Sequence, residues 1–439
     1  MIGVKELVSI LLLNPTVVTM NGENEIIQEG FVYIENGKII DVGSVNKLPY
    51  EYKYSDLVLN LKNKVVLPGF VSYHTHLSLF PLRFMGLGLT LSEWEETVAW
   101  PYESTLTPEE SLYASKLAVY AFIKNGVVAF ADMHFNMDSV AKVAKESGLI
   151  ANLSVAILET GSFSYEKTLK ENIELYRKWN GVDNGRINVY LGPCCLRYLS
   201  REQLSEIALI AKEENIGVHV HASETLDDVR RVKEKFNKRP IEVLKDYGLL
   251  SENTIIAHAV WVTEKEIDYI AKSKANVAHC PVSNNILLSG SMPLVDMVSK
   301  NVRVGFGTDI NPSWDVISEA RLAYYTTNTL YGVPSRISPY MLLEMATGNY
   351  AKFKGIENHG KIAKGYDANI VVLDFTGIRG WPRTSNIYEA ILFSGASIET
   401  VIVRGEVIMD SGEVLTINAD EIRKAKKTIE SKLNEIYGK

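Results

Sequence analysis

The two histidines His74 and His76 stand at the end of an apolar run, where their type and spacing could support metal chemistry. Residues 65–73 before them are rich in valine and aromatic residues, which predicts a buried strand. Side chains two residues apart on a strand project from the same face, so the two imidazoles would lie side by side. Such a pair supplies half of a metal site, provided that distant parts of the chain bring the remaining ligands.

The same kinds of residue recur at the ends of other candidate strands. Apolar segments that predict strands lie at residues 65–76, 127–133, 150–158, 187–192, 216–221, 254–258, 275–279 and 302–309. At or just beyond their ends stand His74, His76, Asp132, His134, His219, His221, Glu224, His258, His279 and Asp309. Seven of the eight histidines are placed in this way, and only His359 is not. Ordinary core or surface histidines would be scattered over helices and loops, so this pattern indicates a functional site.

The spacing of these segments predicts the fold. Helical patterns separate the strands, for instance at residues 108–124, 201–214 and 264–272. Eight strands interleaved with helices over roughly 300 residues favour an α/β fold, a (β/α)8 TIM barrel, over an open doubly wound sheet. Such a barrel builds its active site at the carboxyl ends of its strands. No glycine-rich dinucleotide fingerprint follows the first strand, which disfavours a nicotinamide-binding fold.

The two ends of the chain are predicted to carry short strands that are separated by turns. An Asn36-Gly37 pair separates strand candidates at residues 30–34 and 38–42, which is typical of a β-hairpin. Similar strands occur near residues 366–415. Neither end is long enough to form a sheet core alone, so we expect them to fold together as one small β-sandwich. The predicted domains are residues 1–66 for its first part, 67–365 for the metal-dependent barrel, and 366–439 for its second part and a C-terminal helix.

The composition disfavours several classes of protein. The formal charge is 46 − 53 = −7 without long charged blocks, so neither nucleic acid nor an anionic membrane is expected as a partner. The apolar run at residues 8–13 is too short to span a bilayer and predicts a strand. The cysteines Cys194, Cys195 and Cys280 lack disulfide or zinc-knuckle spacing, which favours the reducing cytoplasm. A small-molecule substrate is the expected partner, and the sequence leaves homo-oligomerisation open.

Four motifs resemble the amidohydrolase superfamily in residue type and in their order along the chain. They are residues 68–76 around the histidine pair, residues 219–225, residues 257–259 and residues 307–309. Within the superfamily, the chain is similar to the branch of 5-methylthioadenosine/S-adenosylhomocysteine deaminases and of triazine and chlorotriazine hydrolases. The segments that carry this likeness are Ser92-Glu93-Trp94, Trp100-Pro101-Tyr102-Glu103, residues 130–135 and residues 278–284.

The resemblance implies a metal-dependent deaminase. The implied ligands of one divalent ion, zinc with iron as an alternative, are His74, His76, His221 and Asp309. No lysine stands near Leu158, where two-metal members of the superfamily carry a bridging carbamate. Metal-activated hydroxide would attack a ring carbon that bears an amine, and Asp309 would accept a proton. Glu224 would protonate the ring nitrogen and then the leaving ammonia, while His258 would hold the attacking oxygen. Asp132 and His219 are expected to support the ligands from behind, and packing or a helix cap is the alternative role for them.

The resemblance also implies the substrate contacts, which are Trp94, Glu103, His134 and Cys194. In the deaminase branch, the counterpart of Glu103 binds ribose hydroxyls and that of Trp94 forms a pocket wall. His134 stands in place of a tyrosine, and Cys194 in place of a histidine that contacts the purine. No arginine occurs between Leu149 and Arg177, where the branch binds the homocysteine carboxylate. We therefore expect an adenosine-like nucleoside with a small, uncharged 5′ group.

Two other interpretations stay open. Another hydrolase of the superfamily would act on a triazine or halogenated ring, a guanine- or cytosine-type base, or a cyclic amide. The same hydroxide would serve, so only the pocket distinguishes these reactions. The second interpretation is a metal-binding barrel without catalysis. Glu224 and His258 beside the ligands argue against it, because a structural site requires no proton shuttle.

Overall fold

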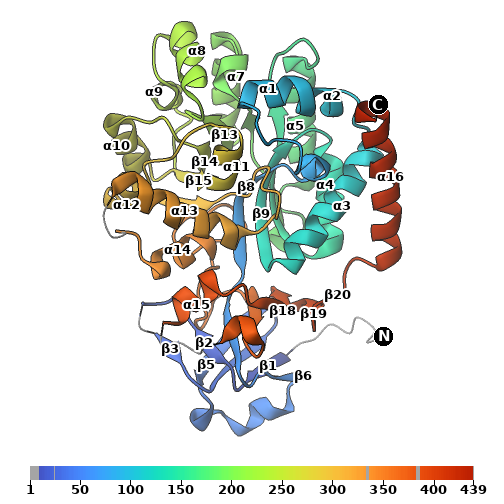
Figure 1. Ribbon diagram of the computed structural model, residues 1–439, viewed down its shortest axis with the longest axis vertical. Coiled ribbons are helices and arrows are strands. Elements are labelled where there is room, and N and C mark those ends of the chain that lie inside the picture. Colours follow the sequence, from blue (N-terminus) through green and yellow to red (C-terminus); the bar gives the residue numbers. More distant parts are fainter. Residues whose placement is uncertain (1–8, 24, 333–335, 382–385, 439) are drawn as a thin grey trace.

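The computed structural model describes residues 9–23, 25–332, 336–381 and 386–438. Two parts follow one another along the long axis of the molecule (Figure 1). The larger part holds strands β8 to β16 and most of the helices, and the smaller part holds the first and last strands of the chain. Val8 of the N-terminal apolar run lies outside the described residues, and the rest of that run is strand β1 (Ser9–Leu13).

The larger part is built on two parallel sheets. One is five-stranded, with the order β11-β10-β9-β8 and with β12 also paired with β10, and the other is four-stranded, with the order β13-β14-β15-β16. The strands are β8 (Phe70–Thr75), β9 (Val127–His134), β10 (Ile150–Ile157), β11 (Ile187–Val189), β12 (Gly192–Pro193), β13 (Val218–Ala222), β14 (Thr254–His258), β15 (Asn276–His279) and β16 (Arg303–Phe306). Isolated parallel bridges join the two sheets, from Leu191 to Val218 and from Thr75 to Asp309. Since all these pairings are parallel, the strands end on one side of the molecule.

Helices surround these sheets and connect their strands (Figure 1). They are α3 (Pro108–Lys124), α4 (Met137–Ser147), α5 (Tyr165–Trp179), α6 (Val182–Gly185), α7 (Arg201–Glu213), α8 (Leu226–Phe236), α9 (Pro240–Asp246), α10 (Glu264–Ser273), α11 (Pro281–Ile286), α12 (Leu294–Ser299), α13 (Val316–Tyr331) and α14 (Pro339–Ala346). Capping boxes at Thr107, Ser200 and Thr263 begin α3, α7 and α10. Each box satisfies backbone N–H groups that the helix leaves unpaired, so the sequence itself sets these three boundaries.

A covering segment, residues 77–103, connects β8 to α3. It consists of η3 (Leu77–Leu82), α1 (Leu91–Trp94), the π-helical turn η4 (Glu95–Ala99) and α2 (Trp100–Glu103). The C-terminal helix α16 (Ala419–Tyr437) packs along α3 and reaches this segment. There the Tyr437 hydroxyl donates to the Val98 carbonyl. The end of the chain therefore supports the covering segment.

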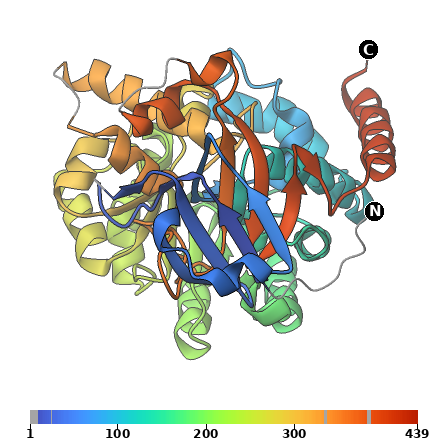
Figure 2. The same ribbon diagram turned by 90° about the horizontal axis from the view of Figure 1, so that it is seen from below.

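The smaller part combines both ends of the chain in two sheets, with the orders β5-β4-β1-β6 and β20-β19-β18-β17-β7-β2-β3. Its remaining elements are β2 (Thr16–Val18), β3 (Ile26–Ile27), β4 (Gly30–Glu35), β5 (Lys38–Ser44), η1 (Val45–Lys47), η2 (Tyr50–Tyr54), β6 (Leu57–Asn60), β7 (Lys64–Pro68), β17 (Ile370–Asp374), η6 (Ile378–Gly380), α15 (Ile387–Phe393), β18 (Ser397–Val403), β19 (Glu406–Asp410) and β20 (Glu413–Val414). Figure 2 shows N-terminal strands in blue beside C-terminal strands in red. One buried cluster contains Ile10 and Val32 from the first sheet and Ile370 and Ile402 from the second. The ends of the chain thus share a core, as predicted.

The single strand expected at residues 65–76 is two strands in the structure. β7 pairs with β17 and β2 in the smaller part, and β8 begins at Phe70 in the larger part. Gly69 joins them at a point of close packing, because a Cβ there would lie 2.3 Å from Cγ1 of Val128. Pro68 and Gly69 therefore divide one apolar run between two sheets, and a hydrophobic pattern alone does not show that division.

Close packing beneath the strand ends gives a prediction about stability. A Cβ on Gly305 in β16 would lie 2.2 Å from the ring of Tyr73, which is fully buried. Gly305→Ala should lower the free energy of unfolding by about 1–3 kcal/mol, because overpacking forces neighbouring groups to shift. Gly377→Ala is the matched control, since its Cβ would meet nothing within 4 Å and its φ is −82°. Thermal unfolding of both variants measures the effect, and equal midpoints would contradict this packing.

Candidate metal centre and active site

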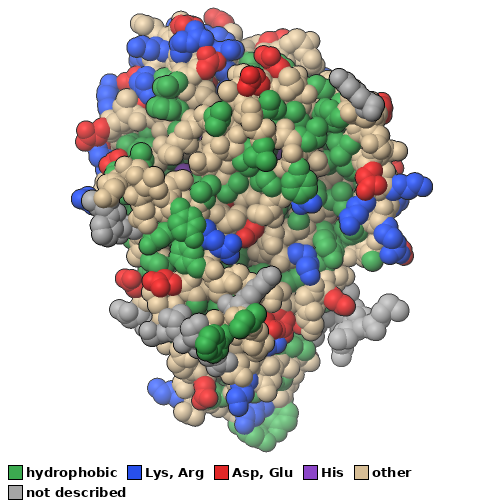
Figure 3. Space-filling view, viewed as in Figure 1, with side chains coloured by type: hydrophobic (Ala, Val, Ile, Leu, Met, Phe, Trp, Pro, Cys, Tyr) green, Lys and Arg blue, Asp and Glu red, His purple; other side chains and the backbone are tan. Residues whose placement is uncertain are grey.

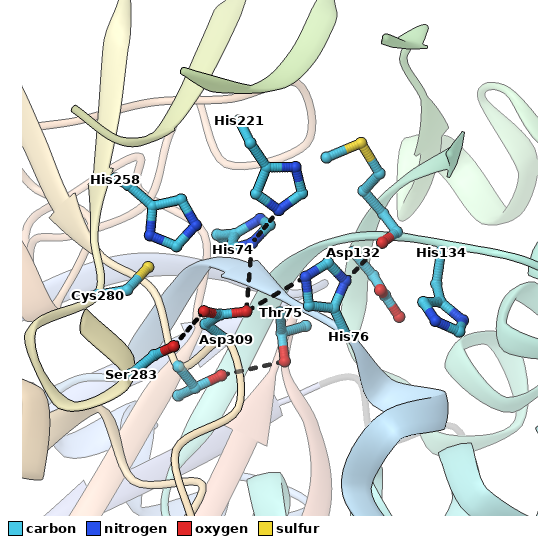
Figure 4. A network of polar contacts seen from close by, with 12 residues as sticks. His74, Thr75, His76, Asp132, His134, His221, His258, Cys280, Ser283 and Asp309 are labelled. Carbon is cyan, nitrogen blue, oxygen red and sulfur yellow. Dashed lines mark hydrogen bonds and ion pairs between the residues drawn. The ribbon is translucent and has the colours of Figure 1, made fainter. Parts of the chain in front are cut away.

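The candidate site lies at the carboxyl ends of the strands, where side chains from separate segments converge (Figure 4). His74 belongs to β8 and His76 follows it directly. Oδ1 of Asp309 lies 3.5 Å from Nε2 of His74 and 3.2 Å from Nε2 of His76. β16, the strand expected to extend to residue 309, already ends at Phe306. Asp309 lies beyond it in the left-handed region, with φ 46°, and its carboxylate faces the two histidines.

His221 of β13 and His258 of β14 complete the cluster. Its five members, His74, His76, His221, His258 and Asp309, are called the donor cluster below. Nε2 of His221 lies 3.1 Å from Nε2 of His74, and the rings of His221 and His258 stack with centroids 5.3 Å apart. Among the described residues, three groups of donor atoms each fall within 4.8 Å and share members; they are His74, His76 and Asp309, then His74, His221 and His258, and then Cys194, Cys195 and His221. Imidazole nitrogens with one carboxylate form a donor set that suits zinc or iron, so these side chains fit a divalent ion.

The second ring nitrogens of these histidines are held from behind. Nδ1 of His76 donates to the Met133 carbonyl at 2.6 Å, and Nδ1 of His221 donates to the Cys194 carbonyl at 2.9 Å. Nδ1 of His74 lies 2.9 Å from Nε2 of the fully buried His219. These contacts leave each Nε2 directed into the cluster and fix the orientation of each ring. The supporting position expected for His219 is therefore the position that it occupies.

The other predicted polar residues near the strand ends lie outside the donor cluster. Oδ2 of Asp132 accepts from the Leu77 N–H at 3.2 Å, and burial raises the pKa of Asp132 to about 7. His279 ends β15 as expected but does not line the pocket, and burial lowers its pKa to about 3. His359 donates from Nε2 to the Gly69 carbonyl at 3.0 Å, beneath the strands. Almost no histidine surface is visible on the face drawn in Figure 3, in keeping with this burial.

Glu224 lies just beyond β13 and is 4% exposed. Its Oε1 accepts from the Ser289 hydroxyl at 3.0 Å, and its Oε2 lies 3.6 Å from Nε2 of His258. Nδ1 of His258 lies 2.9 Å from Oδ1 of Asn284, which accepts its proton. A carboxyl and an imidazole are thus oriented side by side next to the metal-ligating cluster, as a pair of proton-transfer groups requires.

The residues expected to contact a substrate line one pocket together with His76, His221, His258 and Asp309 of the cluster. Nε2 of His134 lies 2.8 Å from Oε1 of Glu103, and Nδ1 of His134 lies 2.7 Å from the Ser78 hydroxyl. Trp94 and Cys194 line the same pocket, as do Glu224 and Asp309. The sequence-predicted contacts and the donor cluster therefore face one shared space.

One wall of this pocket is apolar. The rings of Phe135 and Phe163 stack with centroids 4.1 Å apart and an interplanar angle of 5°. They pack on a buried cluster of Met133, Ala156 and Leu158. Within the part of the chain that the structure describes, neither lysine nor arginine lines the pocket. An anionic group on a ligand would find no lysine or arginine side chain there.

A buried ionic network at the pocket edge was not predicted from the sequence. Glu95 of the covering segment lines the pocket, and its Oε1 accepts from Arg197 at 2.7 Å. Arg197 also lies 3.4 Å from Asp228, which accepts from the Ser223 N–H beside Glu224. Burial raises the pKa of Glu95 to about 7 although Arg197 opposes that shift. The only sequence signal is the acid cluster at residues 93–96, and acids are common on exposed helical turns.

The cluster favours an ionised Asp309. Burial raises the pKa of this carboxyl, but hydrogen bonds from His74 and His76 outweigh burial and hold the pKa well below its usual range. The Ser283 hydroxyl donates to the other carboxylate oxygen, Oδ2. A negative carboxylate among imidazoles is the charge arrangement that a divalent cation needs.

Comparison with known families agrees with this geometry. Residues 65–408 match the model of the Amidohydrolase family. The chain belongs to this family. The family match spans β8 to β16 and therefore every member of the donor cluster. Both the resemblance inferred from the motifs and the assignment to the hydrolases are confirmed.

Named amidohydrolases match nearly the whole chain. A 5-methylthioadenosine/S-adenosylhomocysteine deaminase of Halothermothrix orenii is 34% identical over 419 residues, which cover 94% of this chain and 97% of that one. A 5′-deoxyadenosine deaminase of Methanobrevibacter smithii is 34% identical over 92% of this chain and 93% of its own length. The structure of an adenosine deaminase from Xanthomonas campestris with bound zinc aligns with a TM-score of 0.89 at 22% identity, covering 96% and 98% of the chains. No helix among the described residues of this amidohydrolase could cross a membrane.

Proposed function

We propose that this amidohydrolase is a metal-dependent hydrolytic deaminase of an adenosine-like nucleoside, releasing ammonia from the purine. The observation that carries the proposal is that one pocket is lined by His76, His221 and Asp309 of the donor cluster, by the Glu224–His258 pair and by Glu103. A reacting amine and a sugar diol could thus be held within the same pocket. The deaminase names of relatives that match over more than nine-tenths of the chain support the same reaction.

The arrangement of the sheets supports a proposal about the fold and the domains of the chain. We infer that the two parallel sheets form one (β/α)8 barrel, because bridges join them at both pairs of edges. We assign residues 67–365 to this barrel and residues 1–66 and 366–439 to a β-sandwich with a C-terminal helix. The shared core of the two terminal segments supports the assignment. Three cysteines without disulfide bonds favour a cytoplasmic location.

The residues proposed to hold one divalent ion, with zinc preferred, are His74, His76, His221 and Asp309. When bound, the ion supplies a Lewis acid that lowers the pKa of water towards about 7. Asp309, whose Oδ1 lies 3.2 Å from Nε2 of His76, is the proposed acceptor of a proton from water. His258, whose ring stacks on that of His221, can hold an attacking oxygen by a hydrogen bond.

Glu224 is the proposed proton shuttle. The Ser289 hydroxyl holds its Oε1 by a hydrogen bond. Its Oε2 lies against Nε2 of His258, beside the proposed reaction site. A protonated Glu224 would donate to a ring nitrogen as the ring carbon is attacked. The same group would then deliver a proton to the departing amine, which leaves as ammonia.

The other walls suit a nucleoside. Glu103 can accept two hydrogen bonds from a vicinal diol, and His134 holds that carboxylate in place. Trp94 offers a flat apolar surface, and Cys194 lies where a base edge would approach His221. The stacked Phe135 and Phe163 favour an uncharged 5′ substituent over a carboxylate. We therefore propose 5′-deoxyadenosine-like or methylthioadenosine-like substrates over S-adenosylhomocysteine.

A substrate panel with ammonia release as the readout tests this function. Zinc-loaded and iron-loaded protein should deaminate adenosine, 5′-deoxyadenosine and 5′-methylthioadenosine, and should act weakly on S-adenosylhomocysteine. Turnover only of triazines, free bases or cyclic amides would instead identify another amidohydrolase reaction. Zero turnover of the whole panel by fully loaded protein would indicate a metal-binding barrel without catalysis.

The role of Glu103 predicts a dependence on the ribose hydroxyls. Removing both hydroxyls should lower kcat/KM by several-fold to about 100-fold, since losing this buried contact costs about 1–3 kcal/mol in all. Ribosides are compared with their 2′,3′-dideoxy analogues in the wild type and in Glu103→Gln. The preference for ribosides should shrink in the variant, because a neutral amide replaces the ionic acceptor. Equal efficiency for both substrates in the wild type would exclude this contact.

A further inference from the structure

Two adjacent thiols, those of Cys194 and Cys195, line the proposed substrate pocket, and neither thiol takes part in the proposed proton transfers. Their Sγ atoms lie 3.7 Å apart. Both cysteines are free, and this separation is well beyond the S–S bond length of about 2.05 Å. The pair is therefore a dithiol that opens onto the pocket.

The backbone holds the two thiols in place. The Cys194 N–H donates to the Ile157 carbonyl at 3.1 Å, and the Cys194 carbonyl accepts from the His221 N–H at 2.9 Å. Cys195 also forms a parallel bridge with His221. Strands β10 and β13 thus fix the segment from both sides, so little ordering is needed before the sulfurs bind a common ligand.

The separation of the sulfurs suits one shared centre. Two metal–sulfur bonds of about 2.3 Å would span this gap at an angle of about 107°, which is close to tetrahedral. Nδ1 of His221 lies 3.8 Å from Sγ of Cys194. That nitrogen already donates to the Cys194 carbonyl, and Nε2 of the same ring faces the donor cluster. Both ring nitrogens of His221 therefore already have partners. A ligand bound between the two cysteines would have two sulfur ligands.

We propose that Cys194 and Cys195 form a dithiol site for a thiophilic centre, of the class of trivalent arsenicals and soft metal ions, in the wall of the substrate pocket. Phenylarsine oxide is the suitable probe, because the donor cluster offers it no thiol. Two As–S bonds form as the As–O bond breaks, and the oxygen leaves as water with both thiol protons. Arsenic stays trivalent, so the step needs no oxidant or reductant. The bound phenyl group would occupy the pocket.

Intact-mass spectrometry of the reduced, native chain tests the site without reference to activity. We expect one phenylarsenic unit and the loss of two hydrogens per chain, resistant to a monothiol and reversed by a small dithiol. Because the second sulfur binds intramolecularly, the wild type should bind at least about 100-fold more tightly than Cys194→Ser or Cys195→Ser. Equal binding by the wild type and either single variant, or an adduct only after unfolding, would overturn the proposal.

A third cysteine provides the matched control. Cys280 is fully buried, lies outside the pocket lining, and donates to the Ala278 carbonyl. Cys280→Ser should keep the tight adduct. Circular dichroism and metal content verify folding of each variant, and Cys194→Ser alone decides the test if Cys195→Ser does not fold.

Turnover gives a second readout, which rests on the proposed deamination. Adduct formation should abolish turnover of the wild type and leave the residual turnover of Cys194→Ser unchanged. A stoichiometric adduct with full turnover would overturn the placement of the site in the substrate pocket. Failure of the deaminase proposal would remove this readout only, because the mass measurement stands by itself.

Discussion

Replacing Glu224 with glutamine is expected to lower turnover by at least about 100-fold, the usual contribution of a positioned general acid–base group. The amide keeps the shape of the side chain and its hydrogen bond from Ser289, but it cannot carry a proton to the ring or to the leaving amine. Metal content and thermal stability should stay near those of the wild type, since Glu224 is not among the proposed ligands. Steady-state kinetics with a verified substrate measures the loss.

An exposed acid controls for the change of charge. Glu252 lies on the surface just before β14, away from the pocket lining, so Glu252→Gln should retain full turnover. Near-normal turnover of Glu224→Gln would show that this residue is only a loop carboxylate. Loss of metal from Glu224→Gln would place it among the ligands instead, and both outcomes contradict the shuttle.

The positions of the chemical groups could be predicted because they depend on local patterns. Apolar runs bounded by polar residues mark strands, and parallel strands bring their carboxyl ends to one side. His74, His221 and His258 therefore converge although they are far apart in sequence. The terminal sheets were predictable for the same reason, since Asn36 and Gly37 both adopt positive φ in the expected hairpin turn.

How far along its strand each histidine lies, and therefore whether it reaches the pocket, was harder to predict. His219 and His221 share a face of β13, yet His219 lies two residues earlier, roughly 6.6 Å lower along the strand. That step places its ring behind His74 and outside the pocket lining. His279 also ends a strand but is buried away from the pocket. A strand-end position is thus insufficient to identify a ligand.

Contacts made by loops could not be predicted at all. Ser289 holds Glu224 from 65 positions away, and Glu95 meets Arg197 through the covering segment. Neither contact leaves a periodic or motif signal, because it depends on the path of an irregular segment in space. The break between β7 and β8 at Gly69 belongs to the same class, since only the packing of Val128 reveals it.

Removal of one proposed ligand should abolish metal binding and, with it, turnover. Wild-type protein purified without chelator is expected to carry about one divalent ion per chain. His76→Ala deletes an imidazole whose Nε2 lies 3.2 Å from Oδ1 of Asp309, and it leaves that carboxylate with fewer partners. Even loss of a supporting contact weakens metal sites about 10–100-fold, so loss of a ligand should exceed that range. Elemental analysis after dialysis against a weak chelator measures the effect.

His279→Gln is the matched control, because His279 is a buried strand-end histidine outside the donor cluster. It should retain the ion even if its fold is less stable, whereas His76→Ala should lose the ion with its strands intact. Because an ion that binds only the folded chain stabilises it, dialysis with chelator should lower the thermal midpoint of the wild type but not that of His76→Ala. Two tightly bound ions per chain, or unchanged metal content in His76→Ala, would contradict a single centre held by His74, His76, His221 and Asp309.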